Sequence, residues 1–66
     1  MANLSLNIEA IRVQMGFTRV EMAEKMNISI DRYNRLASGD SKMLAAELVS
    51  LHQISGVPYE NIKVIS

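Results

Sequence analysis

Few side chains in this sequence have the chemistry for catalysis or metal binding. The 66 residues include one histidine and no cysteine, which leaves no set of imidazole or thiolate ligands for a metal. His52 has no serine, aspartate or cysteine at a catalytic spacing, and we interpret it as a surface or half-buried residue. Glu21 and Glu24 lie one helical turn apart, but capping and solvation account for them. We therefore expect no enzymatic activity, no metal and no cofactor.

Basic residues in the middle of the chain offer a different chemistry, which is contact with nucleic acid. An arginine can donate two hydrogen bonds to guanine, and any basic residue can hold a phosphate. The relevant side chains are Arg19, Arg32, Arg35 and Lys42. Seven Lys and Arg balance seven Asp and Glu, however, and a net charge of zero argues against non-specific binding to nucleic acid. Arg32 and Arg35 also fit an ordinary solvated helix face.

Short helices in one domain over residues 1–66 must position these side chains. Apolar residues make up 48% of the chain, yet no apolar stretch approaches the roughly 18 residues that a membrane span needs. No secretion signal precedes the first helix, so we expect a cytoplasmic protein without a membrane partner. The first expected helix covers about 5–15, the second begins after a cap at Thr18 and ends at Asn27, and the third covers about 30–38. The fourth begins after Asp40-Ser41 and ends at Gly56, and a fifth of a turn or two begins at Pro58.

Local signals fix the second and third of these helices best. Thr18 and Glu21 match the capping-box pattern, and Ser29 is the expected cap of the third helix. Asn27 tolerates the left-handed backbone of a helix exit. Apolar residues spaced by three and four predict the core, and Leu44 is expected on the apolar face of the fourth helix. The expected core comprises Ile8, Ile11, Met22, Met26, Tyr33, Leu36, Leu48 and Leu51.

A twenty-residue pattern beginning at Arg19 is typical of a helix-turn-helix. Its fifth position is the small residue Ala23, where two helices cross closely, and its ninth is Asn27, in the tight turn. Its fourth, eighth, tenth, fifteenth and eighteenth positions are apolar: Met22, Met26, Ile28, Tyr33 and Leu36. All of these positions carry the residue type that the motif needs.

The chain resembles the phage repressor and Cro-like helix-turn-helix proteins of the Xre type. The resemblance covers about 8–62 and rests on residues 12–18 (RVQMGFT), residues 21–26 (EMAEKM), Ile28-Ser29, Leu36 with Gly39, and residues 55–57 (SGV). It implies an all-α, lambda-repressor-like fold, a compact bundle of about five short helices. It also implies a transcriptional regulator in a bacterial or phage-infected cell, bound to operator DNA as a homodimer with its third helix in the major groove.

The resemblance also implies which residues face double-stranded DNA. By position these are Thr18, Arg19, Ser29, Ile30, Asp31, Arg35 and Lys42, to which we add Arg32. Arg35 can pair with guanine, Ile30 can touch a thymine methyl group, and the start of the second helix can hold a phosphate. Asp31 can accept only from a cytosine amino group, unless Arg35 one turn later neutralises it.

Apolar residues at the C-terminal end exceed what one small core needs. We expect Tyr59, Ile62, Val64 and Ile65 to form the dimer contact, with residues 62–64 pairing as a strand with a second copy, since no strand partner is evident in the same chain. The alternative is that they cap their own core or fray.

Val20 is expected on the outer side of the second helix. Surplus apolar surface and zero net charge favour an alternative function, a protein-binding module that engages a repressor or other transcription factor.

Overall fold

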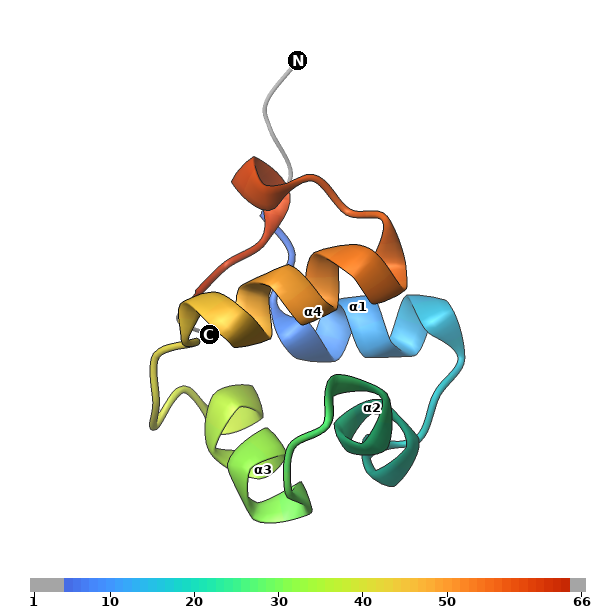
Figure 1. Cartoon of the computed structure of the whole chain (residues 1–66), viewed down its shortest axis with the longest axis vertical. Helices are drawn as coiled ribbons and strands as arrows, with labels where there is room; N and C mark the ends of the chain where they lie inside the picture. The colour runs from blue at the N-terminus through green and yellow to red at the C-terminus, as the bar shows by residue number, and fades with distance from the viewer. Residues whose placement is uncertain (1–4, 65–66) are drawn as a thin grey trace.

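The computed structural model describes residues 5–64, which form four α-helices and one 3-10 turn (Figure 1). These elements are α1 (Ile8–Met15), α2 (Arg19–Met26), α3 (Ile30–Ser38), α4 (Ala45–Ser55) and η1 (Tyr59–Asn61). The all-α expectation is confirmed. Where a fifth helix of a turn or two was predicted, the chain makes the single 3-10 turn η1.

Capping residues set the ends of α2 and α3 as predicted. The Thr18 hydroxyl accepts from the Glu21 N–H at 3.1 Å, and the Glu21 carboxylate accepts from the Thr18 N–H at 2.8 Å. The Ser29 hydroxyl accepts from the Arg32 N–H at 3.0 Å. Asn27 ends α2 with φ 59° and ψ 42°, in the left-handed region that asparagine tolerates. Residues 27–29 therefore connect two well-defined helix ends.

The other helix starts lie later than predicted. The side chain of Asn7 caps α1 by accepting from the Ala10 N–H at 2.8 Å, so the first helix begins at Ile8 instead of near residue 5. α4 begins at Ala45, and Leu44 precedes it with 62% of its surface exposed. The expectation that Leu44 lies on the apolar face of the fourth helix is therefore wrong. Leu44 lacks the polar side chain of a cap, and Glu47 instead accepts from its backbone N–H.

The core lies where the four helices meet. α1 contacts α3 and α4, α2 contacts the same two helices, and α1 and α4 lie side by side in Figure 1. The buried apolar residues are Ile8, Ile11, Met22, Ala23, Met26, Tyr33, Leu36, Met43, Leu51 and Ile62. The predicted core is confirmed except for Leu48, which is half-buried at the edge. Burying a large apolar side chain contributes about 1.5–3 kcal/mol, so packing of this kind is the main source of stability.

The C-terminal segment returns to the start of the chain. Leu6 and Ile62 form a parallel bridge in which the Leu6 N–H donates to the Asn61 carbonyl at 2.7 Å, and the Lys63 N–H donates to the Leu6 carbonyl at 2.9 Å. The expectation that residues 62–64 lack a strand partner in their own chain is therefore wrong. The segment after this bridge also contacts the loop before α4, since the Val64 carbonyl accepts from the Met43 N–H at 2.8 Å. None of the helices within residues 5–64 has the length and apolar character that crossing a membrane requires.

Candidate nucleic-acid interface

The predicted contact residues gather at the starts of α2 and α3 and in the loop before α4. Thr18 and Arg19 open α2, and Lys42 lies in the loop. The start of α3 carries Ser29, Ile30 and Asp31, with Arg35 one turn further on. All of these residues are exposed. Arg32 is half-buried and differs from the rest.

α3 has one buried face and one exposed face, as its sequence predicts. Tyr33 and Leu36 are 0% and 2% exposed, whereas Asp31, Asn34 and Arg35 are exposed. Because side chains three and four positions apart share a helix face, Asp31, Asn34 and Arg35 form one outward stripe. The expected orientation of Arg35 outward and Leu36 inward is confirmed.

Arg19 is held by side chains from two other helices. Its Nη2 donates to Glu9 Oε2 of α1 at 3.0 Å, and its Nη1 donates to Asn34 Oδ1 of α3 at 3.0 Å. The Arg19 side chain is still 48% exposed. The guanidinium therefore has a fixed place on the surface between the start of α2 and the outward stripe of α3.

Glu9 is the centre of this arrangement, although its position in the sequence did not single it out. Its carboxylate also accepts from Arg12 Nε at 2.8 Å and from the hydroxyl of the buried Tyr33. The hydrogen bond from Arg12 is the main reason that the pKa of Glu9 falls from 4.5 to about 2, against the opposing effect of burial. Burial, with the hydrogen bond to Glu9, raises the pKa of Tyr33. The spacing of Glu9 and Arg12 by three residues was the available signal in the sequence.

Arg32 has a partner inside the chain, which neither interpretation of the sequence anticipated. Its Nε and Nη2 donate to the two carboxylate oxygens of Glu47 at 2.7 and 2.8 Å, and Nη2 also donates to the Lys42 carbonyl at 3.2 Å. Glu47 is 6% exposed and accepts from the Leu44 N–H at 2.8 Å. The hydrogen bond from Arg32 lowers the pKa of Glu47. Arg32 thus joins α3 to the start of α4 and does not share the outward stripe.

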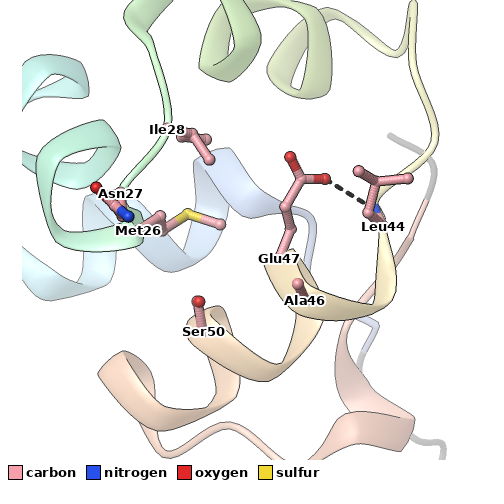
Figure 2. Close-up of a pocket in the computed structure, with 7 residues that line it drawn as sticks. All are labelled: Met26, Asn27, Ile28, Leu44, Ala46, Glu47 and Ser50. Carbon is pink, nitrogen blue, oxygen red and sulfur yellow. Dashed lines mark hydrogen bonds between the residues drawn. The ribbon is translucent and has the colours of Figure 1, made fainter.

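A hollow of about 350 Å³ lies beside this pair, between the end of α2 and the first half of α4 (Figure 2). Its lining is mixed, with four apolar residues and three polar ones, Asn27, Glu47 and Ser50. The lining residues are Met26, Asn27, Ile28, Leu44, Ala46, Glu47 and Ser50.

The predicted dimer residues do not form one exposed surface. Tyr59 is 44% exposed and stacks on His52 with ring centroids 4.1 Å apart. Ile62 is 7% exposed and belongs to the core of its own chain, and Val64 is half-buried against that core. Ile65 lies outside the described residues. For Ile62 and Val64 the structure matches the alternative expectation, that they cap their own core.

Two further observations bear on the kind of site. Within residues 5–64, no group of three or more His, Asp or Glu side chains is arranged to hold a metal ion. Comparison of the chain with protein families, with characterised proteins and with solved structures finds no match. The exposed starts of α2 and α3 are therefore a candidate interface that rests on the sequence pattern, the geometry and the charge of this chain.

Proposed function

We propose that this protein binds double-stranded DNA sequence-specifically and regulates transcription in the manner of phage repressors and Cro proteins. In this proposal α2 and α3 act as a helix-turn-helix, with α3 in the major groove and a homodimer on an operator with two half-sites. The protein acts on DNA in the cytoplasm of a bacterial or phage-infected cell. The supporting observation is the outward stripe of α3 next to two capped helix starts, with Arg35 exposed opposite the buried Tyr33 and Leu36.

Each exposed side chain has a distinct task in this proposal. Arg35 donates to the O6 and N7 atoms of a guanine, and Ile30, which is 38% exposed, meets a thymine methyl group. Arg19 and the start of α2 hold one backbone phosphate, and Lys42 holds another. Arg32 is left out of the contact set because Glu47 occupies it.

Salt dependence tests the electrostatic part of the proposal. Three cations, Arg19, Arg35 and Lys42, face DNA in each protomer, so log K should fall against log salt with a slope of roughly −2 to −3 per protomer. The probe is a duplex selected by the protein from a randomised library, followed by fluorescence anisotropy at several salt concentrations. Failure to select or bind any duplex at low salt overturns the proposal.

Arg35→Ala tests the specific contact. We expect it to weaken binding to the selected duplex by roughly 1–3 kcal/mol and to relax the preference at one base pair, with the melting temperature unchanged. Lys63→Ala is the matched control, because Lys63 is an exposed cation of the C-terminal segment. Equal losses for the two variants would show that Arg35 contributes charge and no base recognition.

The second candidate function is a protein-binding module that engages a repressor or another transcription factor. The observation that favours it is Leu44, a large apolar side chain that lines the hollow and is 62% exposed. The two candidates predict opposite sensitivities. Leu44→Ser should leave DNA affinity unchanged if α3 reads DNA, whereas it should abolish binding to a repressor if the hollow is the working surface.

A further inference from the structure

The Arg19 guanidinium is oriented before any ligand binds. Its Nη2 donates to Glu9 and its Nη1 donates to Asn34, both at 3.0 Å, so acceptors on α1 and α3 hold a residue of α2. These bonds use two of the five N–H donors of the guanidinium. With the side chain 48% exposed, the group also has a surface that faces solvent.

Glu9 is a rigid acceptor because other donors hold it in turn. Arg12 donates to both of its carboxylate oxygens, at 2.8 and 3.3 Å, and the hydroxyl of the buried Tyr33 donates to Oε1. Arg12 is itself fixed by donating to the Phe17 carbonyl at 2.7 Å. Since the pKa of Glu9 is about 2, the carboxylate is ionised at any pH suitable for DNA binding.

We propose that Glu9 is a positioning residue for DNA binding, which holds the Arg19 guanidinium in the orientation that receives a backbone phosphate. This inference rests on the proposed function. A long arginine side chain normally loses its freedom when it binds, and orienting it beforehand removes part of that cost from the binding step. Asn34 assists from α3, so the orientation of Arg19 also depends on where α3 lies relative to α2.

Glu9→Gln changes both the charge near DNA and the orientation of Arg19, and the two changes should affect the affinity for DNA in opposite directions. Removing a negative charge near the phosphates should by itself tighten binding, since DNA repels carboxylates. Losing the orientation of Arg19 should weaken binding by about threefold to tenfold, which is the usual cost of immobilising one flexible side chain. We expect the weakening to prevail.

The experiment measures the affinity of the full chain for the selected duplex by fluorescence anisotropy, at a temperature where circular dichroism shows each variant folded. Glu24→Gln is the matched control, because Glu24 is an exposed residue of α2 and its replacement makes the same change in charge. We expect Glu24→Gln to bind as tightly as the wild type or slightly more tightly. In an Arg19→Ala background, Glu9→Gln should no longer weaken binding.

Asn34→Ala gives a second test that does not depend on the stability of the Glu9 cluster, which is Glu9 with its donors Arg12, Arg19 and Tyr33. Asn34 is exposed and uncharged, so the change alters neither the core nor the net charge. We expect about a twofold to threefold weakening that also disappears in the Arg19→Ala background. A loss that persists without Arg19 would mean that Asn34 contacts DNA directly, which counts against its part in the proposal.

Two outcomes separate this inference from the proposed function. If the wild type binds the duplex and Glu9→Gln binds as tightly as Glu24→Gln, the positioning role is wrong and the DNA-binding function stands. If the wild type binds no duplex, the function itself is wrong and the role of Glu9 falls with it.

Discussion

Two glutamates join α3 to its neighbours, and they differ in what they leave exposed. Glu9 accepts from Arg12 and Arg19, and Glu47 accepts from Arg32 through both carboxylate oxygens. The Glu9 side chain is 25% exposed and that of Glu47 is 8% exposed. Arg19 remains half-exposed at the surface when it donates to Glu9. Arg32, in contrast, is directed away from the outward stripe of α3 by its hydrogen bonds to Glu47.

The difference shows that the basic residues of α2 and α3 are not equivalent. A buried pair is costly to break, because the partner that remains keeps its charge with less water around it, while an exposed pair contributes little. The Arg32–Glu47 pair, whose carboxylate is buried, therefore contributes mainly to the stability of the fold. The Arg19–Glu9 pair mainly orients an exposed arginine. Under the proposed function, the positive charge that faces DNA comes from Arg19, Arg35 and Lys42.

Glu47→Ala should have the largest effect on stability. It removes the two hydrogen bonds from Arg32 to a carboxylate and the acceptor for the Leu44 N–H at the start of α4. Since the half-buried Arg32 regains part of its hydration, we expect the free energy of unfolding to fall by about 2–3 kcal/mol. Urea unfolding followed by circular dichroism measures the loss, with the exposed Glu24→Ala as control. A loss below about 1 kcal/mol would mean that the pair behaves like an exposed ion pair, and the contrast between the two glutamates would disappear.

Acid should have the second largest effect on stability, because it protonates Glu9 and weakens the Glu9 cluster. The folded pKa of Glu9, about 2, lies below its ordinary value of 4.5, so its contribution is complete above about pH 4.5 and is lost as the pH falls toward 2. Allowing for solvent around a side chain that is 25% exposed, the loss is about 2 kcal/mol. Glu21 and Glu47 also have lowered pKa values and add to the loss.

Thermal melts between pH 7 and pH 2.5 test this dependence. The Glu9→Gln variant should show a flatter profile than the wild type, because its amide does not titrate. Parallel profiles for the two proteins would assign the acid sensitivity to the other glutamates.

Tyr33→Phe should have the smallest effect of the three. The ring keeps its place in the core, but the hydrogen bond to the Glu9 carboxylate is lost, at a cost of about 1.5 kcal/mol. Tyr59→Phe is the matched control, because Tyr59 is 44% exposed, and we expect no change in unfolding. The pKa of Glu9 should also rise in Tyr33→Phe, and carboxyl titration by NMR would detect that shift. An unchanged pKa would show that Arg12 and Arg19 sustain the ionised carboxylate without Tyr33.

The sequence predicted the parts of the fold that depend on near neighbours. The capping box of Thr18 and Glu21, the left-handed Asn27 and the inward Tyr33 and Leu36 all follow from spacings of one to four residues. The candidate stripe on α3 follows from the same periodicity.

Contacts between distant residues could not be predicted in this way. Glu47 lies 15 positions from Arg32, and Glu9 lies 24 positions from Tyr33. Many carboxylates in the chain could serve each arginine, and the choice depends on how the helices pack. The partnership of Leu6 with Ile62 was missed for the same reason, and so the burial of Ile62 in its own core was expected only as the alternative to a dimer contact.

The Leu6–Ile62 bridge has a consequence for the order of folding. It joins opposite ends of the described chain, so we expect it to form after the helices have packed, because closing a long loop is slow compared with forming local turns. Contacts that form after the transition state slow unfolding and leave the folding rate almost unchanged. We therefore expect the packing of this segment to lengthen the lifetime of the folded molecule, and Ile62→Ala, which truncates its buried side chain, should speed unfolding far more than it slows folding.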